Sequence, residues 1–205
     1  MSAVVLLIRH GVTDAVGVRL TSRLPGVTLN ALGIEQVAQV CDRLRDLPLA
    51  AVYSSPLERA RATAGPIARG HVLDVIELDA LNEVDFGEWT GLTFDELSRR
   101  PAWARFNAAR ASADVPGGER AADVQRRIVA ALDDLQARHE GAVIAAVSHG
   151  DVIRAAVLHA AGASLDLWHR FEVSPASISV IAYAAGSPRL LGVNEVPGRF
   201  AFDAP

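Results

Sequence analysis

The chain has 205 residues, of which 50% are hydrophobic and 21% are charged, and its formal net charge is −4 at pH 7. This composition predicts a folded protein with a substantial core and not a disordered chain. The negative net charge argues against nucleic acid or an anionic membrane as a partner. The sequence lacks both a run of ~20 apolar residues able to span a bilayer and a signal-peptide pattern at its N-terminus.

Two residue types are used sparingly. Cys41 is the only cysteine, so no internal disulfide can form, and we expect the protein to be soluble and cytoplasmic. Lysine does not occur, and all 20 basic residues are arginine. Together with the abundance of alanine, this usage indicates a GC-rich, bacterial genome. It excludes a Schiff-base lysine and a lysine-bearing phosphate loop. Because arginine is the only cationic residue type besides histidine, the function of each arginine has to be inferred from its position.

Apolar runs that predict strands alternate along the chain with segments of helical pattern. The strands are expected at residues 4–8, 49–53, within 71–81, and at 142–147, 177–183 and 190–194. The helices are expected at 30–47 with Asn30 as N-cap, after Pro56, across 93–111 with an interruption at Pro101, and at 119–139 and 151–161.

This alternation predicts an α/β fold with a mostly parallel sheet between two layers of helices. We expect one domain over residues 1–205, with an excursion at about 82–118 that covers the active site. A homodimer is compatible with the sequence. The role of the tail after Glu195 is left open.

Two of the predicted strands end in the same dipeptide. His10-Gly11 follows the first apolar run, and His149-Gly150 follows the run at 142–147. Ligands of α/β sheets bind at the carboxyl ends of parallel strands, so adjacent strands would bring both imidazoles to one crevice. Arg9 precedes the first histidine, and Arg59 follows a third strand. A neutral imidazole that attacks and guanidinium groups that hold oxyanions suit phosphoryl transfer.

The chain resembles the histidine phosphatase superfamily, also called phosphoglycerate mutase-like proteins of branch 1. The combined motifs are highly specific, although each one alone is weak. They occur in the order of the family and comprise residues 7–13 (Leu-Ile-Arg-His-Gly-Val-Thr), 29–36, 54–64, 81–91, 116–119 (Pro-Gly-Gly-Glu) and 147–150 (Val-Ser-His-Gly).

The resemblance implies a role for each matched residue. His10 would be the nucleophile that becomes phosphohistidine, while Arg9, Arg59 and His149 would line the phosphate pocket. Glu83 would protonate the leaving oxygen and then activate water, with Asp85 and Glu88 as rival acids. No metal and no cofactor is expected, because the sequence has no recognisable metal-ligand motif.

The chain departs from the family pattern near the nucleophile. Val12 stands where the family usually has Glu or Gln, and Val16 stands where an Asn that contacts phosphate is common. These changes predict a thinner phosphate pocket or an altered specificity. The candidate substrate-binding residues are Thr13, Thr21, Ser22 and Arg23, the last for a second anionic group on the substrate.

The preferred function is hydrolysis of a small phosphate monoester, because residues 86–94 have the short form seen in the smaller phosphatases of the family. A phosphoglycerate mutase-type phosphotransferase is the second enzyme hypothesis. A catalytically weak phosphate-binding module is the third reading, motivated by Val12 and Val16. The sequence does not identify the substrate.

Overall fold

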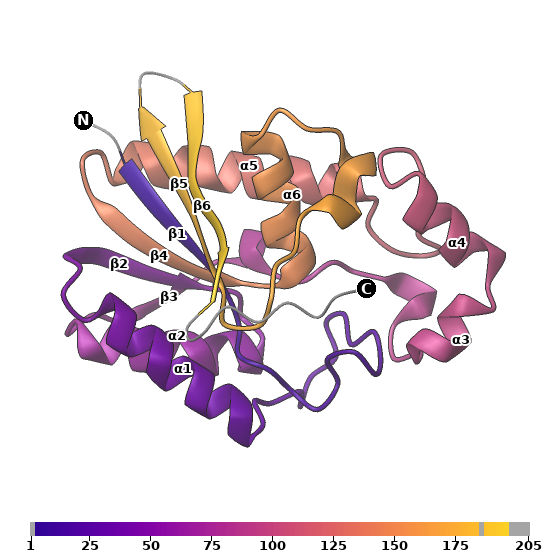
Figure 1. Ribbon diagram of the computed structural model, residues 1–205, viewed down its shortest axis with the longest axis horizontal. Coiled ribbons are helices and arrows are strands. Elements are labelled where there is room, and N and C mark those ends of the chain that lie inside the picture. The colour runs from indigo at the N-terminus through magenta and orange to yellow at the C-terminus, as the bar shows by residue number, and fades with distance from the viewer. Residues whose placement is uncertain (1–2, 185–186, 197–205) are drawn as a thin grey trace.

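The computed structural model describes residues 3–184 and 187–196, which form a six-stranded sheet flanked by helices (Figure 1). The strands are β1 (Ala3–Arg9), β2 (Leu49–Ser54), β3 (Val75–Glu77), β4 (Val143–Ser148), β5 (Ile178–Ala184) and β6 (Ser187–Glu195). Their order is β3-β2-β4-β1-β5-β6, with parallel pairing from β3 to β1 and antiparallel pairing of β5 and β6. The predicted α/β class with a mostly parallel sheet is confirmed.

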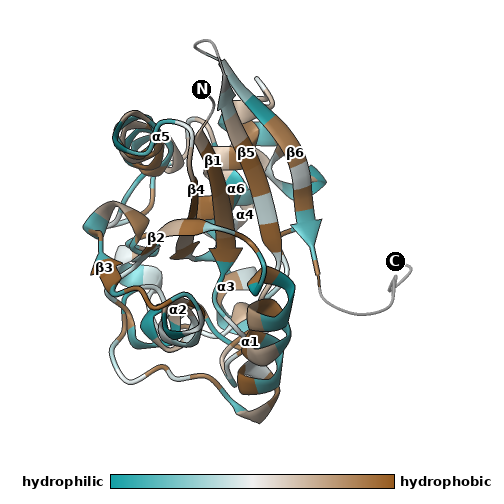
Figure 2. Ribbon diagram, turned by 90° about the vertical axis from the view of Figure 1, so that its left-hand side faces the viewer, coloured by the Kyte–Doolittle hydropathy of each residue, from teal (hydrophilic) through white to brown (hydrophobic). Residues whose placement is uncertain are grey.

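Helices cover both faces of this sheet. Helices α1 (Ala31–Leu44) and α2 (Glu58–Gly70) lie on one face, and α5 (Ala121–Arg138) and α6 (Gly150–Ala160) lie on the other (Figures 1 and 2). Successive strand residues point to opposite faces. Thus Leu7 and Ala146 pack in the core beneath α5 and α6, whereas Ile8 and Val147 pack beneath α1 and α2. This double burial explains why β1 and β4 read as continuous apolar runs.

The excursion between β3 and α5 contains short helical segments. These are the 3₁₀ helices η1 (Asp79–Leu81) and η2 (Gly87–Trp89) and the helices α3 (Phe94–Ser98) and α4 (Pro101–Ala108). Pro101 occupies the first turn of α4, which accounts for the predicted interruption. Trp89 packs edge-to-face on Trp103 and Phe106 and belongs to the core beneath α5 and α6.

Differences from the predicted elements have local causes. Helix α1 ends at Leu44, earlier than the predicted 47, because Pro48 has no N–H to donate to the carbonyl oxygen of Leu44, which accepts from Leu47 N at 2.9 Å instead. Asn30 caps α1 as predicted, and its side chain accepts a hydrogen bond from Gly33 N at 2.9 Å. The 3₁₀ helix η3 (Leu165–Arg170) was not predicted.

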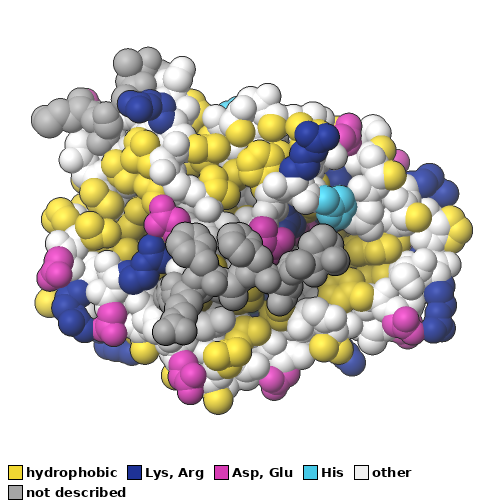
Figure 3. Space-filling model, in the orientation of Figure 1, with side chains coloured by type: hydrophobic (Ala, Val, Ile, Leu, Met, Phe, Trp, Pro, Cys, Tyr) yellow, Lys and Arg dark blue, Asp and Glu magenta, His cyan; other side chains and the backbone are white. Residues whose placement is uncertain are grey.

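Acidic and basic side chains are interspersed over the face of the molecule shown in Figure 3, and the described part of that face carries no large patch of one sign. Among residues 3–184 and 187–196, the structure contains no helix with the length and apolar character needed to cross a membrane. The tail after Glu195, apart from Val196, lies outside the described residues.

The turn after His10 lies directly against the first turn of α1. A Cβ atom on Gly33 would lie 2.2 Å from the carbonyl oxygen of Val12, and one on Gly11 would lie 2.7 Å from the carbonyl oxygen of Gly33. Both contacts are with backbone atoms, which cannot rotate away. The two glycines therefore allow the close approach that fixes the backbone after the histidine.

We predict that Gly33→Ala lowers the free energy of unfolding by about 1–3 kcal/mol, because overpacking must displace backbone. The matched control is Gly65→Ala in α2, where the nearest atom to a new Cβ is a flexible Arg69 nitrogen at 3.4 Å. That variant should gain about 0.5–1 kcal/mol from helix propensity. Denaturant titration of both variants measures the difference, and equal stability of the two would contradict the packing argument.

Candidate active site

Strands β1 and β4 deliver the two histidines to one place. Arg9 is opposite Ser148 in the parallel register, and the backbone N–H of His10 donates to the carbonyl oxygen of Ser148 at 3.0 Å. The ring centroids of His10 and His149 are 5.1 Å apart. The predicted adjacency of the two strands is confirmed, and it places both imidazoles at the carboxyl edge of the sheet.

The environment of His10 fixes which ring nitrogen carries the proton. Its Nδ1 lies 2.7 Å from the carbonyl oxygen of Gly11, which can only accept, so Nδ1 carries the proton and Nε2 carries the lone pair. Burial, followed by the charges of Arg9 and Arg59, lowers the pKa of His10 to about 3. The imidazole is therefore neutral near pH 7 and presents a nucleophilic nitrogen.

Arg59 comes from the first turn of α2 and is only 1% exposed. Its Nε–H donates to His10 Nε2 at 3.3 Å, and its Nη2 donates to the carbonyl oxygen of Ser22 at 2.7 Å. Thr63, one turn further along α2, donates to the carbonyl oxygen of Arg59 and accepts from the N–H of Gly11. Helix α2 thus holds both the arginine and the turn that follows the nucleophile.

Three buried side-chain nitrogens around His10 have no hydrogen-bond partner within the described part of the chain: Arg9 Nε, Arg59 Nη1 and His149 Nδ1. Arg9 is anchored through Nη1 to the carbonyl oxygen of Val173 at 2.6 Å. Burial lowers the pKa of His149 well below its ordinary value, so its ring is neutral as well. Buried polar groups without partners are costly and are typical of sites that await a ligand.

Glu83 lies beside this group. Its Oε2 is 3.8 Å from His149 Nδ1, and its Oε1 accepts from the N–H of Val84. Burial, followed by the charge of Asp151, raises the pKa of Glu83 to about 7 against the opposing effect of Arg59. A carboxyl group that is half protonated at neutral pH can donate a proton and later accept one. Of the rival acids, Asp85 accepts from the N–H of Gly87.

The backbone of Glu83 is held by two arginines. Arg23 Nε and Arg127 Nη2 donate to its carbonyl oxygen at 2.8 and 3.3 Å. The carboxylate of Glu119 pairs with both guanidinium groups and accepts from the N–H of Asp85. Glu119, the last residue of the Pro-Gly-Gly-Glu motif, therefore has a structural role: it holds the two arginines that bind the backbone of Glu83. The side chain of Arg23 is engaged in these contacts, so a direct contact between Arg23 and substrate stays a prediction.

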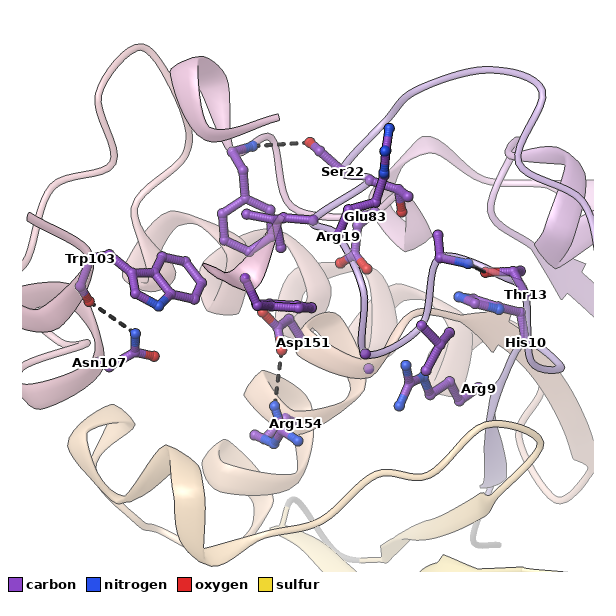
Figure 4. Close-up of a pocket in the computed structure, with 18 of the residues that line it drawn as sticks. Arg9, His10, Thr13, Arg19, Ser22, Glu83, Trp103, Asn107, Asp151 and Arg154 are labelled. Atoms are coloured by element: carbon purple, nitrogen blue, oxygen red, sulfur yellow. Dashed lines mark hydrogen bonds and ion pairs between the residues drawn. The ribbon is translucent and has the colours of Figure 1, made fainter. Parts of the chain in front are cut away.

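A cavity of about 310 Å³ opens beside Arg9, His10 and Glu83 (Figure 4). The predicted substrate-binding residues Thr13, Thr21 and Ser22 line it, and Arg23 is not part of its lining. The Ser22 hydroxyl donates to the carbonyl oxygen of Val84 and accepts from the N–H of Phe86, which ties the loop at 13–22 to the segment of the acid.

The cavity is also lined by residues that the sequence did not identify. Asp151 pairs with Arg154 at 2.9 Å and with Arg110 at 3.5 Å, and the Arg110 guanidinium lies over the ring of Trp168. The residues of the cavity not identified from sequence include Arg19, Phe94, Trp103, Asn107, Arg110, Asp151, Arg154 and His169.

Some of these residues carried a usable signal. Asp151 and Arg154 are three residues apart in the helix predicted directly after His149, so they could have been assigned to the same edge of the sheet. Trp103, Asn107 and Arg110 follow a helical i, i+4, i+7 spacing, but nothing in the sequence indicates that this face borders the cavity.

No cluster of three or more His, Cys, Asp or Glu side chains suited to hold a metal occurs among residues 3–184 and 187–196. Metal independence remains a prediction from the sequence.

The chain matches the family model of the histidine phosphatase superfamily (branch 1) over residues 5–196. The chain therefore belongs to this superfamily, as its motifs predicted. Bifunctional protein Rv2228c of Mycobacterium tuberculosis is 38% identical over 193 residues, which are 93% of this chain and 53% of that protein. The chain thus spans about half the length of this relative.

Two further proteins are similar over most of their length. Phosphoserine phosphatase 1 of Hydrogenobacter thermophilus is 30% identical over 86% of this chain and 84% of its own. The crystal structure of phosphoserine phosphatase from Entamoeba histolytica in complex with 3-phosphoglyceric acid has a TM-score of 0.86 and 27% identity, covering 95% of this chain and 98% of that one. Both of these similar proteins are named as phosphoserine phosphatases.

We predict that Arg23→Ala lowers kcat by about tenfold for every phosphate ester, because loss of a charge-assisted hydrogen bond frees the backbone of Glu83. KM should change little. Steady-state kinetics with a simple alkyl phosphate and with one that carries a carboxylate test this expectation.

The matched control is Arg126→Ala, which removes a largely exposed guanidinium paired with Asp123 and should leave kcat unchanged. A loss in the Arg23 variant confined to KM of the carboxylate-bearing ester would instead indicate a direct substrate contact.

Proposed function

We propose that the chain is a metal-independent phosphomonoesterase that works through a phosphohistidine on His10. The observation that carries the proposal is the neutral Nε2 of His10 surrounded by the unpartnered nitrogens of Arg9, Arg59 and His149. These groups offer one nucleophile and several donors for the oxygens of a phosphoryl group. Phosphoryl transfer needs little more than such positioning and electrostatic stabilisation.

In the first step the hydrogen bond from Arg59 Nε–H to His10 Nε2 is given up, and the lone pair of Nε2 attacks phosphorus while the bond from phosphorus to the ester oxygen breaks. The leaving oxygen takes the proton of the Glu83 carboxyl group, so an alcohol departs and Glu83 becomes a carboxylate. The new phosphohistidine carries positive charge on its ring. The carbonyl oxygen of Gly11, 2.7 Å from Nδ1, stabilises that charge by accepting the Nδ1 proton in a hydrogen bond.

In the second step water attacks phosphorus and the bond to Nε2 breaks. The Glu83 carboxylate takes a proton from the water, which regenerates the acid, and His10 recovers its lone pair. Inorganic phosphate is the product. A pKa of about 7 lets Glu83 serve in both directions near neutral pH.

The size of the cavity, about 310 Å³, favours a small phosphorylated metabolite as substrate. The names of the phosphoserine phosphatase relatives support the same substrate class. The single cysteine favours the cytoplasm as the site of action. Thr13, Thr21 and Ser22 line the same cavity as the nucleophile.

We predict that His10→Ala lowers kcat by about 10⁴–10⁶-fold, because the covalent step is lost, while the fold is retained. Rapid quenching of the wild-type enzyme with a ³²P-labelled ester should trap an acid-labile label on the peptide that contains His10. Circular dichroism checks the fold of the variant. Label found on His149 instead would overturn the assignment.

We predict that Glu83→Gln slows hydrolysis of alkyl phosphates by ~10²–10⁴-fold and of nitrophenyl phosphate far less, because nitrophenolate departs without a proton. The matched control is Asp85→Asn two residues away. Any loss of rate in Asp85→Asn, relative to the wild type, should be the same for alkyl phosphates and for nitrophenyl phosphate. The reverse pattern would assign the acid to Asp85.

The pH profile gives a second readout of the same variant. The acid form of Glu83 declines as pH rises through its pKa of about 7, so kcat/KM for an alkyl phosphate should fall above that pH. Towards low pH, His10 stays neutral down to its pKa of about 3. The alkaline fall should be absent in Glu83→Gln, whereas ionisation of the substrate affects both enzymes equally. An unchanged profile in the variant would exclude Glu83 as its source.

A further inference from the structure

The hydroxyl of Ser55 contacts the imidazole of His149 in the interior of the protein. Its Oγ is 2.8 Å from His149 Nε2, and both residues are 0% exposed. Ser55 follows the last residue of β2, and its backbone N–H donates to the carbonyl oxygen of Val147 at 2.9 Å. The hydroxyl is therefore held against the imidazole by the pairing of β2 with β4.

The hydroxyl of Ser55 has one proton to give. Its oxygen already accepts from the backbone N–H of Leu57 at 3.3 Å. Within the described structure, His149 Nε2 is the only acceptor at hydrogen-bond distance from the Ser55 hydroxyl. If Nε2 donated instead, the Ser55 proton would be buried without an acceptor. Hydrogen-bond satisfaction therefore favours a lone pair on Nε2 and, in a neutral ring, a proton on Nδ1.

That proton points to the reacting groups. His149 Nδ1 is buried, has no partner within the described ranges, and lies 3.8 Å from Glu83 Oε2, which is beyond hydrogen-bond distance. The opposite tautomer would direct a lone pair at the negatively charged oxygens of a phosphoryl group. A neutral histidine can therefore help the reaction only in one of its two tautomers.

We infer that Ser55 is a positioning residue that holds His149 in the Nδ1–H tautomer, so that His149 donates a hydrogen bond to the phosphoryl group. This inference rests on the proposed function for the identity of the acceptor. The tautomer itself is a property of the free protein. Failure of the inference can thus be separated from failure of the proposed activity.

Long-range ¹H–¹⁵N NMR of the wild-type protein without substrate tests the tautomer directly. The chain has six histidines, and the His149 signals are assigned by their loss in His149→Ala. We expect a protonated Nδ1 and an unprotonated Nε2 near neutral pH, and a mixture of tautomers in Ser55→Ala. A proton on Nε2 in the wild type overturns the inference whatever the enzyme hydrolyses.

A double-mutant cycle tests whether Ser55 acts through His149. With nitrophenyl phosphate as substrate, Ser55→Ala should lower kcat/KM by about 10- to 100-fold in the presence of His149 and cause no further loss in the His149→Ala background. Affinity for orthovanadate should follow the same pattern. Additive losses in the two backgrounds would reduce Ser55 to a general packing role and contradict the inference.

The matched control removes the neighbouring hydroxyl. Ser54 is also 0% exposed, but its Oγ donates to the carbonyl oxygen of Ser55 and does not contact a histidine. Ser54→Ala should keep the His149 tautomer and change kcat/KM by less than about twofold. Equal losses in the Ser54 and Ser55 variants, with an unchanged tautomer in both, would assign the effect to packing at the end of β2.

Discussion

Parallel pairing of β1 with β4 is the constraint on which the rest of the site depends. It sets Arg9 opposite Ser148, so that the next residue of each strand is a histidine at the same edge. The surrounding contacts then refine this placement. The carbonyl oxygen of Gly11 selects the tautomer of His10, Arg59 reaches its Nε2 from α2, and a pair of arginines holds the backbone of Glu83. The register of β1 against β4 therefore places the reacting groups together at the carboxyl edge of the sheet.

Short sequence patterns are sufficient to predict much of this arrangement. Continuous apolar runs identified β1 and β4 because both faces of the sheet are covered, and the repeated His-Gly dipeptide marked where they end. Asn30 was recognised as a cap because its role depends only on a residue three positions away. Features of this kind are encoded within a few residues and need no knowledge of the tertiary structure.

Contacts between distant segments could not be predicted in the same way. Arg23 reads as a free cation in the sequence, yet its guanidinium meets Glu119, which lies 96 residues further along the chain. The hydroxyl of Ser55 reads as part of a helix start signal, and its contact with His149 spans 94 residues. Residues such as Trp103 and Arg110 follow a helical spacing, but the cavity that they border exists only once the excursion has folded.

The two ends of the cavity come from different kinds of structure. His10 stands at the end of β1 and Glu83 follows η1, whereas Phe94, Trp103, Asn107 and Arg110 lie further along the chain, in α3, in α4 and directly after it. Mutations within residues 94–110 can alter this part of the lining while His10 and Glu83 stay in place. Selection can therefore change which ester is accepted through substitutions at a few positions within residues 94–110, without changing the residues that carry out the chemistry.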